Sequence, residues 1–281
     1  MNLPNLRLAL LQMTSIDDVE INYQQIKDLI EEGIKKHGAF DLVCLPENAL
    51  YMRLKEGQKI PGLSLSDEVF TRLSLLAQEM KLHIHVGASP LLIEGHLYNA
   101  SVFITPFGDV RSTYKKMHLF DIQLQGQKPV RESDVFRHGS SPSIIEVNGW
   151  KIGESICYDL RFSELYAQYA RAGVDAILVP SSFLVKTGQA HWEVLLRARA
   201  IESQAFVLAA AQSGTHQGVE GGLRETYGHS LIIDPWGQVL SVLSEGRGVV
   251  FAELSRSRVE EVRRQIPMQD HRRIPVAPFK S

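Results

Sequence analysis

The chain is poor in cysteine and carries little net charge. Its 281 residues include only two cysteines, Cys44 and Cys157, and 30 Lys plus Arg balance 32 Asp plus Glu. Two thiols are too few for a disulfide scaffold or a four-thiolate zinc site. A net charge of −2 supplies no basic surface, so we expect neither nucleic-acid nor membrane partners. The open question is whether either cysteine is chemically active.

Long hydrophobic runs and nucleotide-binding motifs are also lacking. No apolar run approaches the ~20 residues that span a bilayer, and the first residues, MNLPNLRLALLQM, do not resemble a signal peptide. We therefore expect a reducing, cytoplasmic location in which both thiols stay free. The sequence contains no glycine-rich phosphate loop, no H-E-x-x-H and no C-x-x-C. We accordingly expect neither a metal nor an organic cofactor.

Amphipathic helical patterns alternate with short apolar runs at both ends of the chain. From Val19 to Lys36 and from Ser66 to Met80, apolar residues recur every three or four positions, which is typical of one helix face. Hairpin signals fill the middle, and Asn148-Gly149 is the strongest. This order predicts an α/β fold with a mixed sheet or a pair of sheets. No linker or repeat is visible, so we expect one domain over residues 1–281, with its core at about 5–255 and a C-terminal extension at 256–281.

The Gly-rich segment from Gly214 to Gly222 is typical of an exposed loop. Further helices are expected near Ser163–Arg171, His191–Ser203 and Arg256–Gln265. Strands are expected at Leu6–Met13, Asp41–Leu45, His83–Ala88, Asn99–Thr105, Val110–Tyr114, Ser143–Val147, Lys151–Ile156, Ala176–Pro180, Phe206–Gln212 and Val249–Glu253.

Polar residues follow several of these strands. Glu47 comes directly after Asp41–Leu45, at the kind of strand end where α/β folds place ligand sites. The alternative is a loop carboxylate that caps the next element. Lys115 and Lys116 end another strand, and because successive side chains alternate faces, one lysine is expected to point inward. The alternative there is a charged edge strand.

The two cysteines differ in their surroundings. Cys44 lies mid-strand in an apolar run and is expected to be a small core residue. Cys157 closes the run WKIGESI, and the polar Asp159 follows two residues later. A strand-to-helix turn presents the residue at its apex to free backbone N–H groups, which suits a nucleophilic thiol. On these residues alone, catalytic and structural interpretations of Cys157 are equally open, and ten histidines leave a Cys–His dyad possible.

The segments LPEN, YKKMHLFD and ESICYDLRFSELY occur in this order, and together they resemble the three signature segments of the nitrilase, or carbon–nitrogen hydrolase, superfamily. The resemblance extends from RLALLQM to GVVFAEL. It implies a Glu–Lys–Cys triad at Glu47, Lys116 and Cys157, and a supporting glutamate at Glu132. It also implies a four-layer α-β-β-α sandwich that forms homodimers or larger homo-oligomers.

The resemblance further implies a reaction. Cys157 would attack an amide carbon, Glu47 would carry the proton, and Lys116 with the backbone N–H of Tyr158 would hold the oxyanion. The segments TGQAHWEVLLRARAIE and LQGQKPVRES are most similar to the branch of deaminated glutathione amidases, so a small ω-amide is the expected partner. The alternatives are an ω-amidase acting on 2-oxoglutaramate, a nitrilase, an N-carbamoyl amino acid hydrolase, and a non-catalytic binding protein.

Four further residues are expected to contact substrate. Ser181, Ser182 and Phe183 follow an apolar strand, although they also suit a loop that leads into a helix. Arg161 suits either a substrate carboxylate or a neighbouring acidic side chain. Residues 48–54 and the loop Gly214–Arg224 depart from both branches, and we expect these segments to line the site.

Overall fold

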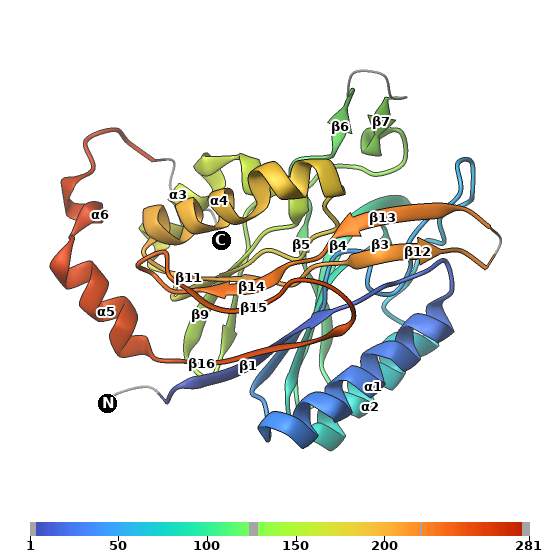
Figure 1. Cartoon of the computed structure of the whole chain (residues 1–281), viewed down its shortest axis with the longest axis horizontal. Coiled ribbons are helices and arrows are strands. Elements are labelled where there is room, and N and C mark those ends of the chain that lie inside the picture. Colours follow the sequence, from blue (N-terminus) through green and yellow to red (C-terminus); the bar gives the residue numbers. More distant parts are fainter. Residues whose placement is uncertain (1–3, 124–128, 220, 277–281) are drawn as a thin grey trace.

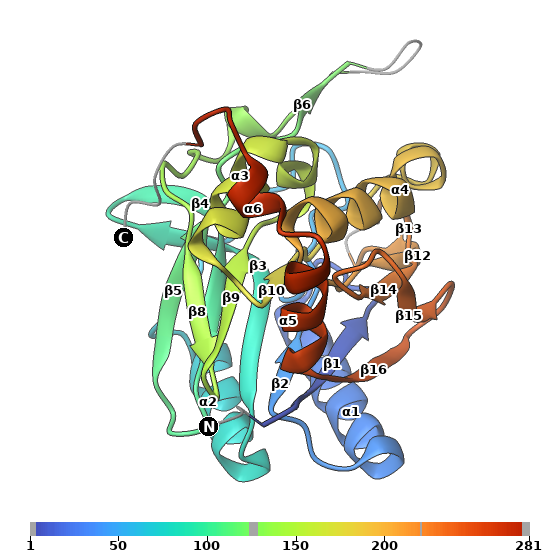
Figure 2. The same ribbon diagram turned by 90° about the vertical axis from the view of Figure 1, so that its left-hand side faces the viewer.

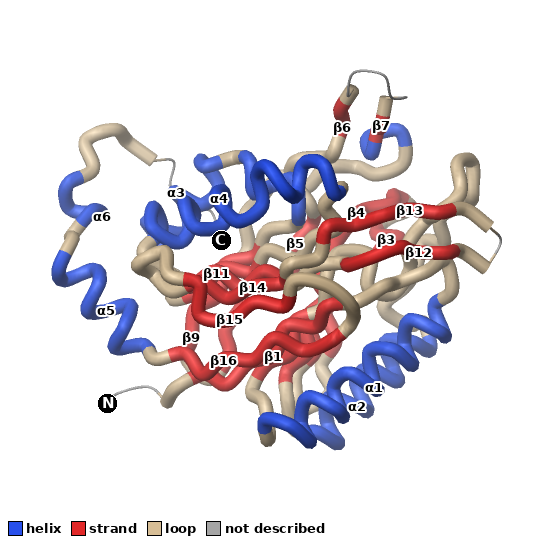
Figure 3. Tube along the Cα trace, viewed as in Figure 1, coloured by secondary structure: helices blue, strands red, loops and turns tan. Residues whose placement is uncertain are grey.

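The computed structural model describes residues 4–123, 129–219 and 221–276 of the chain. The LQGQKPVRES segment therefore lies partly outside the described residues, as do the last five residues of the expected C-terminal extension. The described chain folds into two six-stranded sheets that pack face to face, with helices on both outer faces (Figures 1 and 3).

The strand order is β16-β1-β2-β3-β4-β5 in the first sheet and β15-β14-β11-β10-β9-β8 in the second. The first sheet contains β16 (Gly248–Leu254), β1 (Leu6–Gln12), β2 (Leu42–Cys44), β3 (His83–Ile93), β4 (His96–Ile104) and β5 (Val110–Lys115). The second sheet contains β15 (Val239–Leu243), β14 (Ser230–Ile233), β11 (Phe206–Ala209), β10 (Ala176–Leu178), β9 (Trp150–Glu154) and β8 (Ile144–Val147). Two smaller ribbons pair β12 (Ser213–Gln217) with β13 (Leu223–Tyr227) and β6 (Asp121–Ile122) with β7 (Val130–Arg131).

Helices α1 and α2 belong to the first half of the chain, and α3 to α6 belong to the second. The α-helices are α1 (Val19–His37), α2 (Glu68–Met80), α3 (Ser163–Ala172), α4 (Val185–Ser203), α5 (Arg256–Gln265) and α6 (Met268–His271). Two 3-10 turns complete the set, η1 (Glu132–Asp134) and η2 (Cys157–Arg161). Among the described residues, none of the helices is both long enough and apolar enough to cross a membrane.

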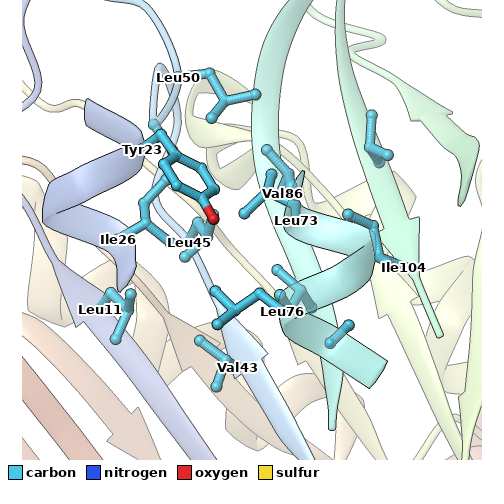
Figure 4. Packing of buried hydrophobic residues seen from close by; sticks show 14 of the residues in the cluster. Leu11, Tyr23, Ile26, Val43, Leu45, Leu50, Leu73, Leu76, Val86 and Ile104 are labelled. Atoms are coloured by element: carbon cyan, nitrogen blue, oxygen red, sulfur yellow. The ribbon is translucent and has the colours of Figure 1, made fainter. Parts of the chain in front are cut away.

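Successive side chains of the central strands enter two different apolar layers. In β1, Leu8 and Leu10 pack between the sheets, whereas Ala9 and Leu11 pack toward α1 and α2. Because both faces of the strand are covered, the sequence there is a continuous apolar run. Figure 4 shows Leu11 in the layer beneath α1 and α2.

The second sheet repeats this arrangement. In β10, Leu178 faces the first sheet, and Ile177 faces the layer under α3 and α4. Helices α1 and α2 lie on one outside of the molecule, and α3 and α4 lie on the other (Figure 2). The four-layer α-β-β-α sandwich implied by the sequence resemblance is therefore confirmed.

Two local predictions were wrong. Helix α4 begins at Val185, six residues before the expected start at His191. Within this additional first turn, Gly188 packs so closely on Tyr227 that a Cβ there would lie 2.3 Å from the ring. The segment Gly214–Gly222 is not simply an exposed loop, since its first residues belong to strand β12. His216 in that strand is fully buried and holds the ribbon against the body of the protein.

Candidate active site

The strands that carry the predicted site residues end at one edge of the sandwich. Strands β1, β2 and β3 run parallel in the first sheet, and β9, β10 and β11 run parallel in the second. Glu47 follows β2, Lys116 follows β5, and Cys157 follows β9. The carboxyl ends of parallel strands are where α/β folds form ligand sites.

A close backbone approach brings the two sheets together at this edge. Gly87 of β3 lies against the ends of both neighbouring strands, and a Cβ at this position would lie 2.1 Å from the carbonyl oxygen of Leu45 and 2.4 Å from Cβ of Pro180. Only glycine leaves room for both contacts. Its small size allows the loop that carries Glu47 to lie next to the loop that contacts Cys157.

Lys116 is buried between two carboxylates. Its Nζ lies 2.8 Å from Oε1 of Glu47 and 2.9 Å from Oε2 of Glu132. The lysine side chain is only 2% exposed, so these ion pairs replace the water that its charge loses on burial. Lys115, in contrast, lies over the ring of Tyr98. The alternation of a strand therefore directs one lysine inward and the other outward, as expected.

Cys157 occupies a strained position at the start of η2. Its φ is 48°, in the left-handed region that non-glycine residues seldom adopt. The backbone N–H of Cys157 donates to the carbonyl oxygen of Pro180 at 2.9 Å. Its thiol lies within hydrogen-bonding reach of the Glu47 carboxylate and of the Ser182 backbone N–H. The turn thus presents the sulfur to the residues that end β2 and β10.

Asp159 connects this turn to the segment that follows Lys116. Its Oδ2 accepts hydrogen bonds from the Ile156 backbone N–H at 2.9 Å and from the Tyr114 hydroxyl at 2.8 Å. Its Oδ1 accepts from the His118 backbone N–H at 2.9 Å and contacts the His118 ring at 2.7 Å. One fully buried carboxylate therefore fixes the nucleophile turn relative to the lysine segment.

The charges of the cluster are strongly coupled. Burial and the Glu47 carboxylate raise the pKa of the Cys157 thiol, against the opposite effect of Lys116. Burial alone would raise the pKa of Glu47, but the Lys116 ammonium holds it below its usual value. Burial alone would lower the pKa of Lys116, but Glu132 and Glu47 raise it well above its usual value. The resting site therefore holds a neutral thiol, an ionised Glu47 and a cationic Lys116.

These side chains surround one cavity of about 120 Å³. That volume is close to the ~150 Å³ of an apolar cavity that takes a benzene ring, so only a small group can reach the sulfur. A wider groove of about 630 Å³ continues outward and shares part of the lining. Of the predicted site residues, the cavity is lined by Glu47, Lys116, Glu132, Cys157, Ser182 and Phe183.

Three predicted site residues do not line the cavity. Ser181 is fully buried, and its hydroxyl donates to the carbonyl oxygen of Val179, so its prediction as a substrate contact is wrong for its side chain. Arg161 contacts the His191 ring at 3.1 Å and lies 5.5 Å from the centroid of the Phe183 ring, and its contact with substrate stays a prediction. The ring of Tyr158 packs on aromatic neighbours, and the oxyanion role predicted for this residue concerns its backbone N–H alone.

Sequence reasoning did not single out several polar residues of the lining, among them Asn99, Arg53 and Arg224. Asn99 of β4 donates from one Nδ2 to Oε1 of Glu47 at 3.0 Å and to Oε1 of Glu132 at 2.9 Å. An asparagine inside an apolar strand was an available signal, because asparagine is depleted in strands. Arg53 and Arg224 also line the cavity. Both come from the two segments that depart from the expected branches, and among the described residues of the segment Gly214–Arg224 only Arg224 is in the lining.

The described residues contain no group of three or more histidine, cysteine, aspartate or glutamate side chains arranged to hold a metal ion. Cys44 is buried between the sheets, and burial raises the pKa of its thiol. It therefore behaves as the inert core residue that its sequence context predicts.

Comparison with known proteins identifies the class to which this site belongs. The family model "Carbon-nitrogen hydrolase" matches residues 7–264, and the chain belongs to this family. The chain is 38% identical to the deaminated glutathione amidase of Bos taurus over 274 residues, covering 95% of this chain and 81% of that protein. It is 36% identical to the deaminated glutathione amidase of Synechocystis over 271 residues, covering 94% and 97%.

A solved structure supports the same membership. The crystal structure of Saccharomyces cerevisiae Nit3, a member of branch 10 of the nitrilase superfamily, matches with a TM-score of 0.83 and 28% identity over 96% of this chain and 97% of that chain. The fold, the family model and the similarity to the curated relatives together support carbon–nitrogen hydrolase activity of the amidase type.

Proposed function

We propose that this protein is a thiol amidase that hydrolyses the amide bond of deaminated glutathione through Cys157. The observation that carries the proposal is the convergence of Glu47, Lys116 and Cys157 on one small cavity. The substrate is suggested by relatives named deaminated glutathione amidase that are 36% and 38% identical to this chain. The reaction needs no resident metal or organic cofactor.

The first half of the reaction forms a thioester. The Cys157 sulfur attacks the amide carbon while the Glu47 carboxylate takes the thiol proton. The negative charge that develops on the carbonyl oxygen is stabilised by the Lys116 ammonium and by the backbone N–H of Tyr158. Glu47 then gives its proton to the departing nitrogen, the C–N bond breaks, and amine or ammonia leaves.

The second half returns the enzyme to its starting state. Glu47 takes a proton from water, and the resulting hydroxide attacks the thioester carbon. Collapse of the tetrahedral intermediate breaks the C–S bond and releases the carboxylic acid. Glu47 returns its proton to the leaving thiolate, which restores the thiol and the ionised carboxylate. Glu132 is a positioning residue in this scheme, because its contact with Lys116 holds the ammonium at the place where the oxyanion forms.

The decisive experiment compares Cys157→Ala with the parent chain on a substrate panel. The panel contains deaminated glutathione, 2-oxoglutaramate, a simple nitrile and an N-carbamoyl amino acid, which separates the alternatives that use the same triad. We expect deaminated glutathione to be the best substrate, with turnover reduced at least about a thousandfold in Cys157→Ala. Unchanged activity of the variant would refute the triad, and inactivity of the parent chain on every amide would favour a binding protein.

An acyl-enzyme measurement provides an independent check. Intact mass spectrometry after rapid mixing is expected to detect the substrate acyl group on the parent chain and none on Cys157→Ala. Unfolding temperatures of both proteins serve as the control, because the substitution removes one sulfur from a cavity wall and is expected to leave the fold intact.

Assembly and location also belong to this proposal. We propose a homodimer or larger homo-oligomer that pairs through the outer helices, supported by Val194 and Ile201 of α4, which are 63% and 45% exposed. Light scattering of the purified chain tests this assembly. The unpaired state of Cys44 and Cys157 supports a reducing compartment such as the cytoplasm.

A further inference from the structure

We propose that Arg224 binds a carboxylate of the substrate and makes this site selective for anionic amides. The inference rests on the proposed amidase function and narrows its substrate class. It concerns a residue of the cavity lining that the triad mechanism does not use.

The geometry of the β12–β13 ribbon directs Arg224 toward the protein. Side chains alternate along a strand, and in β13 the residues Leu223 and Glu225 are exposed while Thr226 is buried. Arg224 shares the face of Thr226, is half-buried, and lines the cavity beside the thiol. A guanidinium on this face borders both the cavity and the outer groove.

The ribbon is fixed at the position of Arg224. His216 lies directly opposite Arg224 in the β12–β13 ladder. The ring of His216 is fully buried, with Nδ1 2.7 Å from the carbonyl oxygen of Ser15 and Nε2 2.7 Å from the hydroxyl of Thr226. Arg224 is therefore presented from an anchored strand, and a preorganised cation binds an anion at a lower entropic cost.

Arg224 has unused hydrogen-bonding capacity inside the protein. Its Nε is buried and has no hydrogen-bond partner among the described residues, and the same is true of Oγ of Ser182 in the same cavity lining. A buried donor without an acceptor is unfavourable. Two such atoms in one cavity indicate that the substrate supplies their partners.

The charge of the lining favours an anion. Four cationic side chains, Arg53, Lys116, Arg131 and Arg224, line the cavity together with two carboxylates, Glu47 and Glu132. The two carboxylates already contact Lys116. The arginines are therefore in excess, and the guanidinium fork is the side chain best suited to bind a carboxylate in a bidentate manner.

Burial distinguishes Arg224 from the other two arginines. All three arginines also line the outer groove, but Arg53 and Arg131 are exposed, whereas Arg224 is half-buried. Water screens the charges of Arg53 and Arg131, so they attract an anion without fixing its position. Arg224 is the arginine of the lining that is partly removed from water, and we assign the selective contact to it.

The test measures binding to the full chain carrying Cys157→Ala, so that no ligand is cleaved. Titration calorimetry compares glutaramate, which has one carboxylate, with glutaramide, its neutral isostere. We expect glutaramate to bind at least about tenfold more tightly. Adding Arg224→Gln is expected to weaken the binding of glutaramate by about tenfold to a hundredfold. The affinity for glutaramide is expected to change less than about twofold. Arg224→Lys is expected to recover part of the lost affinity for glutaramate, because lysine retains the charge but lacks the planar guanidinium that binds a carboxylate through two N–H groups.

Arg264→Gln is the matched control. Arg264 is an exposed arginine of α5 outside the cavity lining, so its substitution removes the same charge from the chain and is expected to leave both affinities unchanged. Equal affinity of the Cys157→Ala protein for the two ligands would overturn the inference, as would no binding of glutaramate. An equal loss of affinity for both ligands on adding Arg224→Gln would also overturn it.

Turnover by the chain with Cys157 intact separates this inference from the proposed function. A preference for glutaramate in binding without hydrolysis of any amide would leave Arg224 as an anion site and refute the amidase. Hydrolysis of glutaramide and glutaramate at equal kcat/KM would retain the amidase and refute the selectivity. We expect kcat/KM to favour glutaramate, and Arg224→Gln to remove that preference mainly through KM.

Discussion

Asn99 shows how one neutral side chain allows two carboxylates to share a lysine. Its amide Nδ2 contacts Oε1 of Glu47 at 3.0 Å and Oε1 of Glu132 at 2.9 Å. Without this donor, the two carboxylates would have only Lys116 between them. Because hydrogen bonds to charged acceptors are the strong ones in proteins, Asn99 is expected to keep Glu47 in the orientation that receives the Cys157 proton.

Replacing Asn99 by Leu, which has a similar size, tests this positioning role. We expect kcat for the best amide substrate to fall about tenfold to a hundredfold, because each lost bond to a charged group is worth ~1.5–3 kcal/mol. KM is expected to change less than about threefold, since Asn99 acts on Glu47 and not on the substrate carbonyl. Steady-state kinetics measure both quantities. An unchanged kcat would contradict the role, and a parallel collapse of the unfolding temperature would indicate a folding defect instead.

The β12–β13 ribbon is an element whose stability depends on a neutral histidine. Burial, the largest effect, lowers the pKa of His216 from 6.5 to about 4. Nδ1 donates to the Ser15 carbonyl and Nε2 accepts from the Thr226 hydroxyl, an arrangement that requires the uncharged ring. Protonation would turn that acceptor into a donor and place a charge next to Arg224.

The sign of the pH dependence follows from this lowered pKa. Between pH 6.5 and about 4, His216 is mainly protonated in the unfolded chain and mainly neutral in the folded chain. The free energy of unfolding therefore falls as the pH decreases through this range. The loss reaches about 3 kcal/mol. Urea unfolding of the parent chain and of His216→Gln at several pH values measures it. The difference in the free energy of unfolding between the two proteins is expected to change over this pH range. A pH-independent difference would show that the protonation of His216 does not change on unfolding.

A buried polar cluster joins the two sheets of the sandwich. Nε2 of His85 on β3 lies 3.0 Å from Oε1 of Glu154 on β9, and both residues are fully buried. Thr113 donates to Oε1 of Glu154 at 2.7 Å, and Ser143 donates to Oε2 at 2.6 Å. The surrounding layer between the sheets is otherwise mainly apolar. This cluster therefore specifies how one sheet sits on the other.

A double-mutant cycle on His85 and Glu154 tests this contact between the sheets. We expect His85→Leu alone to lower the free energy of unfolding by about 1–3 kcal/mol, because it removes one of three hydrogen-bond partners of a buried carboxyl group. The double variant His85→Leu, Glu154→Leu is expected to lose less than the sum of the two single variants. Denaturant unfolding measures all four proteins, and additive losses would rule out direct coupling across the sheets.

Much of the fold and part of the site were predictable from local sequence. Each central strand is an apolar run of strand length, and the helices α1 and α2 repeat their apolar residues every three or four positions, so the α/β class was readable. The Asn148-Gly149 pair predicted the β8–β9 hairpin, in which both residues have positive φ. Glu47, Lys116 and Cys157 stood out because polar residues end apolar strands, and three such motifs in order are specific.

The rest of the site depends on contacts between distant segments. Asn99 and Arg224 reach the cavity only because β4 and the β12–β13 ribbon fold over the strand ends, and His216 holds that ribbon at Ser15, 201 residues earlier in the chain. Ser181 was misplaced for a local reason, since its hydroxyl donates to the carbonyl oxygen of Val179 two residues earlier in the chain. Apolar periodicity is a local property, and it specified the α/β class. The four layers and the triad were predicted from the resemblance of three ordered sequence segments to a known family. The surroundings of the thiol arise from the approach of segments far apart in the chain, and only the tertiary structure determines them.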